Sequence, residues 1–398
     1  MASIDAMPGR IVNADGKAPR LIFLVTEDWY FWAHRLPQAR AARDAGFDVA
    51  VATRVDRHGE RIKGERFALH PLGWRRGSIN PLAGFMAVLE VARLYRRERP
   101  AIVHHVSQKP ILIGSIAARV VGGLRIVNAL TGLGFLFTAS GLKTRLLRSV
   151  LLPVFRGIAR RPAVRFLVEN PDDGRLLRRL DVVPSERIVL IRGSGVDTDH
   201  YRPLPEPANS PITIACATRM LRIKGVAEVV EAFRLAHTRL PDLHLLLAGA
   251  PDPENHAAIP LDDLKRWATE PGIEWLGHVE DIRQVWARAH IAVLASQGGE
   301  GIPMTLMEAA ACGRPMVATD VPGCREIVRS EETGLLAPPG DIRALADAFL
   351  RMASDAELRR RCGAAARVRV EDGLDARSIG RETVAVYRDL IAMQAGAV

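Results

Sequence analysis

Two glutamates stand eight positions apart in the stretch GEGIPMTLMEAAACGRP, which runs from residue 299 to residue 315. Glu300 comes just before a short, nearly all-apolar segment that reads as a helix, and Glu308 lies inside it. Pro303 suits the first helical position, because that position needs no N–H donor. Side chains lean toward the start of a helix, so both carboxylates can reach one ligand. Carboxylates only accept hydrogen bonds, which suits a polyhydroxylated molecule, with one acid on sugar hydroxyls and one on ribose hydroxyls.

The backbone around Glu300 adds a site for negative charge. The amides of Gly301, Met304 and Thr305 would be free at a helix N-terminus, where the helix dipole favours anions. The alternative is an ordinary helix start with a dipole-favoured acid and an incidental second glutamate. The glycines that flank Glu300 and the apolar helix favour a binding site, because a glutamate in a buried helix needs a partner.

Two cations follow a predicted strand further upstream, in the stretch ATRMLRIKG. Arg219 can donate two parallel hydrogen bonds to two oxygens, and Lys224 adds a positive charge. Together they suit a diphosphate. Fixed cations at this place would stabilise the negative charge that develops on a diphosphate leaving group. Two solvated loop charges are the alternative interpretation.

The stretch IVHHVSQKP carries His104 and His105 on a predicted strand and Lys109 at the start of the next helix. Because side chains alternate along a strand, only one of the two histidines can face a site. We expect the other to be buried in the core with its ring nitrogens hydrogen-bonded. The sequence has no H-E-x-x-H or paired-cysteine pattern, and we therefore expect no metal. Its glycine loops match neither the dinucleotide nor the P-loop fingerprint, which argues against an oxidoreductase, a kinase or an ATPase and against a bound cofactor.

Length and charge limit the classes of protein further. The 398 residues suffice for two domains, and no apolar run reaches the length of a bilayer span without a charge. The net charge is +10, but residues 1–200 carry +14 and the rest −4. A basic half suggests phosphates, an anionic membrane surface or nucleic acid. It lacks interleaved aromatic residues and any recognisable nucleic-acid-binding module, so we expect no nucleic acid. The four cysteines lack metal-type spacing and read as reduced thiols of a cytosolic protein.

Short apolar runs alternate with helical patterns throughout the chain. The predicted strands are 21–26, 47–53, 101–106, 125–130, 164–170, 187–191, 212–218, 243–249, 273–277, 290–296 and 315–320. Continuous apolar strands separated by helices predict an α/β protein with parallel sheets covered on both faces. Two such series predict two doubly wound, Rossmann-like domains that face a central cleft, with the loops after the strands gathered in it.

The domain limits follow from this pattern and from the Pro- and Asp-rich joint GVDTDHYRPLPEPANSP. We expect residues 1–19 to be a flexible tail and residues 20–204 to form the first domain. Residues 205–375 would form the second domain. Residues 376–398 would form a C-terminal helix that packs back on the first domain.

Three motifs, EGIPMTLMEAAACGRPMVATDVPGCREIV, GLLAPPGD and RMLRIKG, together resemble the second domain of the retaining glycosyltransferases of family four, which have the glycosyltransferase-B fold. The first domain resembles the branch of that family that acts on polyprenyl-diphosphate-linked saccharides. It does so through Arg35-Leu36-Pro37, then GSINP, the His-rich strand with its lysine, and TGLGFLF. The Gly-Gly that many members carry in the first loop is missing here.

The resemblance implies a role for each candidate residue. Glu300 would contact hydroxyls of the donor sugar, Glu308 the ribose, and Arg219 with Lys224 the diphosphate. One histidine of the pair described above would lie near the donor sugar. The further positions that it implies are Gly301, Ile302, Met304, Thr305, Gly249 and His278 for the donor, and Arg35, Lys109 and Gly132 for the acceptor. Members of the family retain anomeric configuration, usually need no metal, and close their domains over the donor, which excludes water.

The basic segment 141–162 has a Leu/Val/Phe face and no acid. This composition suits a helix in a membrane interface, and the alternative is a sheet-covering helix with a solvated basic face. The resemblance thus implies a retaining hexosyl- or N-acetylhexosaminyltransferase for bacterial surface polysaccharide or glycan synthesis. Its partners would be a UDP-sugar, a polyprenyl-diphosphate-linked saccharide and an anionic membrane surface, at the cytoplasmic face of the plasma membrane. A soluble acceptor, a sugar-nucleotide 2-epimerase and a non-catalytic nucleotide-sugar scaffold are alternatives.

Overall fold

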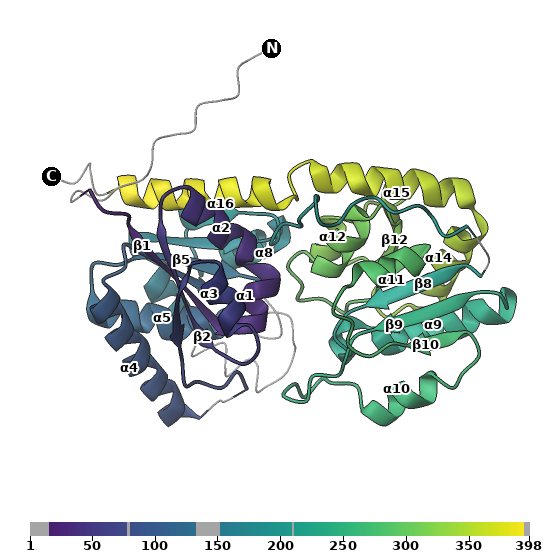
Figure 1. The fold of residues 1–398 in the computed structure, drawn as a ribbon, viewed down its shortest axis with the longest axis horizontal. Coiled ribbons are helices and arrows are strands. Elements are labelled where there is room, and N and C mark those ends of the chain that lie inside the picture. The colour runs from purple at the N-terminus through teal and green to yellow at the C-terminus, as the bar shows by residue number, and fades with distance from the viewer. Residues whose placement is uncertain (1–15, 78–79, 133–151, 209–210, 394–398) are drawn as a thin grey trace, which may run out of the picture.

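The computed structural model describes residues 16–77, 80–132, 152–208 and 211–393. They form two α/β domains that lie side by side, each built on one parallel sheet (Figure 1). The first sheet has seven strands in the order β3-β2-β1-β4-β5-β6-β7, and the second has six in the order β10-β9-β8-β11-β12-β13. Each sheet starts at a central strand and extends outward in both directions. The predicted pair of doubly wound domains is therefore confirmed.

The first domain contains the following elements: β1 (Arg20–Glu27), α1 (Asp28–His34), α2 (Leu36–Asp44), β2 (Asp48–Arg54), α3 (Gly59–Gly64), β3 (Ala68–Pro71), α4 (Pro81–Glu98), β4 (Ile102–Val106), α5 (Gln108–Val121), β5 (Arg125–Leu130), β6 (Val164–Val168), α8 (Pro171–Arg179) and β7 (Ile188–Leu190). The second domain and the C-terminus contain β8 (Thr213–Ala217), α9 (Val226–Arg239), β9 (His244–Ala248), α10 (Leu261–Trp267), β10 (Ile273–Trp275), α11 (Arg283–Arg288), β11 (Ile291–Leu294), α12 (Met304–Ala311), β12 (Met316–Thr319), α13 (Pro322–Arg325), β13 (Gly334–Ala337), α14 (Ile342–Ser354), α15 (Ala356–Glu371) and α16 (Ala376–Ala392).

All eleven predicted strands are present, and two further strands, β3 and β13, were not predicted. Both have four residues and both lie at an edge of their sheet. β3 has the sequence ALHP and β13 has the sequence GLLA. Edge strands of this length lack the long apolar run that marked the central strands, and a proline is tolerated there because one side of the strand is unpaired.

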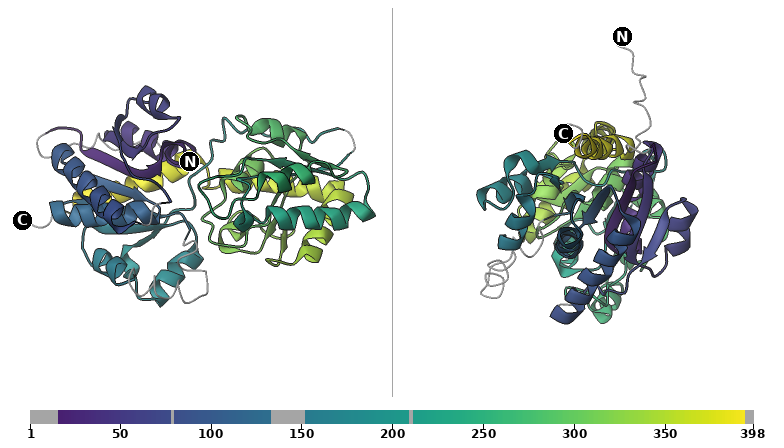
Figure 2. Two further views of the ribbon diagram at one scale, coloured as in Figure 1. Left: turned by 90° about the horizontal axis from the view of Figure 1, so that it is seen from below. Right: turned by 90° about the vertical axis from the view of Figure 1, so that its left-hand side faces the viewer.

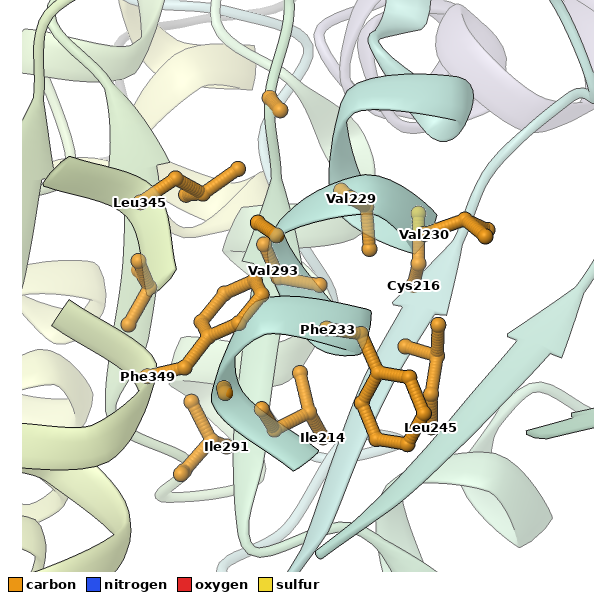
Figure 3. Close-up of a cluster of buried hydrophobic side chains, with 14 of the residues drawn as sticks. Ile214, Cys216, Val229, Val230, Phe233, Leu245, Ile291, Val293, Leu345 and Phe349 are labelled. Carbon is orange, nitrogen blue, oxygen red and sulfur yellow. The ribbon is translucent and has the colours of Figure 1, made fainter. Parts of the chain in front are cut away.

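Each sheet is covered by helices on both faces, so its central strands consist mostly of apolar residues. Figure 3 shows one such layer in the second domain, where Phe233 of α9 and Phe349 of α14 point at the strands. The strand residues that they meet include Ile214 of β8 and Ile291 and Val293 of β11. This packing fixes the carboxyl ends of β8 and β11, which carry the candidate donor residues.

The chain passes between the domains twice, and the two passages lie together. Val196 forms an isolated parallel bridge with Asp375, with hydrogen bonds from the Val196 amide to Leu374 at 3.1 Å and from the Ala376 amide to Val196 at 2.9 Å. Figure 2 shows the domains side by side with the α15–α16 segment running along both of them. The last strand of the first sheet ends at Leu190, before these passages.

The C-terminal helix α16 lies along the first domain beside α2 (Figure 1). Its Gly380 permits a close approach, since a β-carbon there would lie 2.6 Å from Cβ of Ala41. The buried hydroxyl of Tyr387 bonds to Nδ1 of His104 at 2.6 Å, and its ring packs edge-on against Phe47. The helix therefore completes one face of the first domain's core.

The basic segment 141–162 is described only in part. Residues 152–159 form a helix in which Phe155 is buried in the core and Arg156 donates to two backbone carbonyls, both at 2.7 Å. This end packs on the domain, as the sheet-covering alternative requires, and residues 141–151 lie outside the described residues. Over the part of the chain that the structure describes, every helix is too short or too polar to cross a bilayer.

The α16 contact predicts a large loss of stability when Tyr387 is truncated. Tyr387→Ala should lower the free energy of unfolding of the first domain by about 3–5 kcal/mol, because a buried ring is lost. Tyr387→Phe should cost about 1–3 kcal/mol, because His104 loses its partner. Urea unfolding measures both, with Val368→Ala on the exposed side of α15 as a control that should stay within about 0.5 kcal/mol. A Tyr387→Ala variant as stable as this control would contradict the described docking of α16.

Candidate active site

The candidate site lies where loops at the carboxyl ends of the two sheets meet. The guanidinium of Arg219, which follows β8, lies over the ring of Trp29 in α1, with 5.7 Å from Cζ to the ring centroid. Arg219 also donates to Asp252 at 3.2 Å, and Arg76 of the first domain donates to both oxygens of Asp252 at 2.8 and 2.6 Å. The interface thus holds one carboxylate between a cation of each domain.

Glu300 and Lys224 form the centre of the site. The Glu300 carboxylate accepts from Nζ of Lys224 at 2.7 and 2.8 Å and from the Ser296 hydroxyl at 3.0 Å. Gly225 follows Lys224 with a φ of 71°, and a β-carbon there would lie 1.8 Å from the carbonyl oxygen of Ala295 after β11. The glycine therefore lets the Lys224 turn lie against the segment that leads to Glu300.

The start of α12 lies directly beside this pair. Pro303 is the N-cap and the helix begins at Met304, one residue later than the sequence suggested. The Ile302 amide donates at 3.2 Å to the carboxylate of Glu169, which belongs to the first domain. The hydroxyl of Thr305 is buried and has no hydrogen-bond partner among the described residues. A free hydroxyl and helix-terminal amides at one place suit an anionic, hydroxylated ligand.

Three glycines allow the loop before α12 to pack closely against its neighbours. A β-carbon at Gly132 of the first domain would lie 2.2 Å from the carbonyl oxygen of Gly299. One at Gly301 would lie 1.8 Å from a carboxylate oxygen of Glu169, and one at Gly323 would lie 1.5 Å from the carbonyl oxygen of Gly301. Gly132, which we expected on the acceptor side, therefore lies against the candidate donor loop.

Glu169 and Asn170 are site residues that the sequence analysis missed. Glu169 accepts from the Arg35 guanidinium at 2.8 Å, and the side chains of this pair are only 9 and 4% exposed. Asn170 donates to the backbone carbonyl of Glu300 at 3.4 Å. Both residues follow β6, and the sequence analysis assigned them to the strand itself, although polar residues after an apolar run are a signal of a strand-end loop. Arg35 was expected to meet an acceptor phosphate, but its burial and its partner Glu169 keep it inside the interface.

Glu308 lies one turn further along α12, where it accepts from the Tyr201 hydroxyl at 3.0 Å. Burial raises the pKa of Glu308 to about 7, although the hydrogen bond from Tyr201 lowers it. Near neutral pH, the neutral and ionised forms of Glu308 are therefore both populated in the absence of a ligand. Glu300 is paired with Lys224 and Glu308 with Tyr201, so the two glutamates have separate partners here.

Neither His104 nor His105 reaches the interface, which corrects the expectation that one of them faces the site. They are 1 and 0% exposed, because β4 is a central strand with helices on both faces. His104 bonds to Tyr387, and His105 bonds to Tyr95 at 3.0 Å and to Asn128 at 2.8 Å. Burial lowers the pKa of His105 to about 4 and that of His104 well below its usual range, so both are neutral.

A third histidine, His34 at the end of α1, lies near the candidate cations instead. Its ring is 4.3 Å from that of Tyr30, centroid to centroid. Burial, together with the smaller effect of the positive charges of Arg35, Lys224 and Arg219, lowers the pKa of His34 to about 3. The sequence analysis expected the loop of His34 to face the site but did not single out this residue.

Three other predicted residues follow strands: Gly249 and His278 follow β9 and β10 of the second sheet, and Lys109 follows β4 of the first. Gly249 has a φ of 143°, and a β-carbon there would lie 1.8 Å from the carbonyl oxygen of Thr218, so the ends of β8 and β9 lie close together. His278 is exposed in the loop after β10. Lys109 starts α5 and donates to the Arg76 carbonyl at 3.4 Å, and burial lowers its pKa.

Metal ligands do not gather in the described part of the chain. Among those residues, no group of three His, Cys, Asp or Glu side chains is placed so that it could hold a metal ion. The expectation that the protein needs no metal and no cofactor stays a prediction.

Comparison with known families agrees with this geometry. Residues 20–158 match the family described as glycosyl transferase 4-like, and residues 211–355 match glycosyl transferases group 1. The two matched regions identify this chain as a glycosyltransferase. Each family model covers one of the two sheets, and the candidate site lies between the matched regions.

Relatives of this glycosyltransferase make bacterial glycans. It is 23% identical over 353 residues to the N,N'-diacetylbacillosaminyl-diphospho-undecaprenol alpha-1,3-N-acetylgalactosaminyltransferase of Campylobacter jejuni, covering 85% of this chain and 91% of the relative. It is 23% identical to the capsular polysaccharide biosynthesis glycosyltransferase CapM of Staphylococcus aureus, covering 78% of this chain and 82% of the relative.

Solved structures confirm the glycosyltransferase-B fold. Anabaena HepE in complex with UDP aligns with a TM-score of 0.75 at 19% identity, over 93% of this chain and 100% of that one. Sucrose-phosphate synthase from Thermosynechococcus elongatus aligns with a TM-score of 0.77 at 22% identity, over 94% of this chain and 100% of that one.

The buried Arg35–Glu169 pair predicts a strong effect of removing one partner. Glu169→Gln should lower the free energy of unfolding of the glycosyltransferase by about 3–5 kcal/mol, because Arg35 is left buried without its counter-charge. The double variant Arg35→Met, Glu169→Leu should recover much of this loss, because it leaves no buried charge. Urea unfolding of these two variants and of the exposed control Glu186→Gln tests this. A Glu169→Gln variant no less stable than the control would show that the pair is not formed.

The raised pKa of Glu308 predicts that the stability of the ligand-free enzyme depends on pH. A carboxyl with a raised pKa stabilises the fold when protonated, and this contribution is lost as pH rises from its unfolded value through about 7. Glu308→Gln imitates the neutral acid, so the variant should match the wild type near pH 4 and exceed it by about 3 kcal/mol near pH 8. Urea unfolding at pH 4 and pH 8 measures this difference. The exposed Glu357→Gln is the control, and an identical pH profile for Glu308→Gln and wild type would contradict the assignment.

Proposed function

We propose that this glycosyltransferase moves a hexose or N-acetylhexosamine from a UDP-sugar onto a polyprenyl-diphosphate-linked saccharide, with retention of anomeric configuration. The observation that carries the proposal is the Lys224–Glu300 pair at the start of α12, with Arg219 on the neighbouring strand end. Cations, a carboxylate and free helix amides at one place match a diphosphate that is joined to a sugar.

The donor would exchange partners with the residues that pair in the ligand-free enzyme. Lys224 and Arg219 turn to the diphosphate oxygens, and the Glu300 carboxylate accepts from hydroxyls of the sugar. Ser296 holds one oxygen of Glu300, which limits how far that side chain moves. Since negative charge grows on the diphosphate as its bond to the sugar breaks, the two cations stabilise the transition state more than the ground state.

The nucleoside end would lie toward the other strand ends. Glu308, once ionised, accepts from the ribose hydroxyls, and the base lies near Gly249 and His278. The backbone amides of Gly301, Met304 and Thr305 complete the contacts with sugar and phosphate. His34, rather than either histidine of β4, is the histidine near the donor, and as a neutral imidazole it can both donate and accept a hydrogen bond.

The reaction transfers one glycosyl group. The bond from the anomeric carbon to the diphosphate breaks and a bond to an acceptor hydroxyl oxygen forms on the same face of the sugar. The hydroxyl proton leaves with the released nucleotide. The proposed acceptor class is supported by the name of the Campylobacter relative, which states a diphospho-undecaprenol-linked acceptor, and by the basic first half of the chain. The enzyme would work at the cytoplasmic face of the membrane, attached peripherally.

Transfer assays with a panel of UDP- and GDP-sugars and a polyprenyl-diphosphate-linked saccharide test this function. Glu300→Gln, Arg219→Ala and Lys224→Ala should each lower transfer by about 100-fold or more, because each removes a charge that the transition state needs. Arg222→Ala, an exposed cation in the same turn as Lys224, is the matched control and should keep activity.

Each other outcome of these assays would overturn a stated part of the proposal. Full activity of all three variants would refute the site. Transfer only to water-soluble acceptors would refute the lipid-linked acceptor, and isomerisation of the donor alone would identify a sugar-nucleotide epimerase. Inversion of the anomeric configuration in the product would refute retention. The donor itself is identified by the sugar nucleotide that raises the thermal unfolding midpoint most at equal concentration.

A further inference from the structure

The helix α4 presents an outward face that the first domain does not cover. Its inner side, with Ala87, Val91 and Tyr95 among others, is buried in the core. On its outer side, Leu82, Phe85 and Met86 are 69, 59 and 52% exposed. Figure 1 shows α4 on the outside of the first domain, beside α5. These three exposed apolar side chains lie within two turns and form a cluster that is typical of an interaction surface.

The same outer face becomes basic toward the end of the helix. Positions 82, 85 and 86 are followed by Arg93, Arg96 and Arg97 at spacings of 11, 14 and 15 residues from Leu82. At 3.6 residues per turn, all six side chains fall on one side of α4. All three arginines are exposed. The face is therefore apolar in its first half and cationic in its second half.

Among the residues that the structure describes, the acids of α4 pair with only one arginine of this face, Arg97. Glu90 accepts from the backbone amide of Gly73 at 3.1 Å, and Glu98 pairs with Arg20 at 3.4 Å as well as with Arg97 at 2.9 Å. Between residues 72 and 121, the chain has eight Lys and Arg against two Asp and Glu. The surface around α4 thus carries a positive field as well as an apolar cluster.

A hollow of about 510 Å³ adjoins the apolar half of α4. Trp74, Arg75, Met86, Arg93 and Lys109 are among its lining residues. Since Lys109 follows β4 at the carboxyl edge of the first sheet, the hollow joins the outer face of α4 to the side of the domain on which the candidate site lies.

We propose that the outer face of α4 docks on the surface of an anionic phospholipid bilayer. Leu82, Phe85 and Met86 enter the boundary of the acyl chains, and Arg93 and Arg96 contact lipid phosphates. Burial of the apolar side chains and attraction of the cations act together in such a contact. This inference rests on the proposed function, because a lipid-linked acceptor would reach the enzyme from that surface. It places the membrane contact on α4 rather than on segment 141–162.

Flotation of the full chain with vesicles tests the inference. Vesicles of phosphatidylcholine with phosphatidylglycerol should carry the wild type upward at low salt, and pure phosphatidylcholine should carry much less. Leu82→Ser with Phe85→Ser should reduce flotation by roughly tenfold or more. Arg93→Gln with Arg96→Gln should reduce it by roughly fivefold for each arginine and weaken its salt dependence.

Matched variants elsewhere keep the experiment specific. Leu235→Ser with Leu261→Ser removes two exposed apolar side chains of the second domain, and Arg343→Gln removes an exposed cation there. Both should float like the wild type. A wild type that never floats, or α4 variants that float as well as these controls, would overturn the inference. So would a dimer that the α4 variants dissociate without a change in flotation, since the face would then bind a second copy.

The failure of this inference can be told apart from failure of the proposed function. The α4 variants should keep the thermal shift caused by UDP, and transfer to a short-chain, water-soluble diphosphate-linked acceptor should be unchanged. Loss of both in the α4 variants would show damage to the fold and overturn the assignment of this face to lipid. Flotation without any transfer to a lipid-linked acceptor would leave the docking surface in place and refute the proposed function alone.

Discussion

The candidate donor site depends on a close approach of backbones from both domains around the loop that precedes α12. Gly132 and Gly323 leave room for this loop on two sides, and Glu169 receives the Ile302 amide while it is held by Arg35. No side chain larger than hydrogen fits at these contacts without displacing a backbone. The position of the loop, and with it the direction of α12, is thus set by the first domain as much as by the second.

Charges at the interface are paired before any ligand arrives. Lys224 neutralises Glu300, and Asp252 lies between Arg76 and Arg219. Charges that are partly withdrawn from water need partners, and a nucleotide diphosphate sugar supplies substitutes of both kinds: phosphate oxygens for the cations and hydroxyls for the carboxylate. Such an exchange costs less desolvation than binding to unpaired charges, and it couples donor binding to the contact between the domains.

The sequence could predict the sheets and much of the second domain's site, because continuous apolar runs and the polar loops that follow them are local signals. For that reason, the sequence analysis could assign Glu300 and Lys224 to the same candidate site. Contacts between domains have no local signal, and the role of Glu169 was therefore missed. His104 and His105 show the limit of strand alternation: a central strand of a covered sheet has two inner faces, so neither alternate side chain reaches a ligand.

Hydrogen–deuterium exchange with and without UDP tests most directly whether the start of α12 and the Lys224 turn form the donor site. Bound nucleotide should slow exchange of the amides in residues 301–306 and 222–226, since those groups would gain hydrogen-bond partners and lose mobility. Peptides of α4 should exchange at the same rate in both states. Unchanged exchange in both segments at a UDP concentration that raises the thermal unfolding midpoint would contradict the account, because the nucleotide would then bind elsewhere.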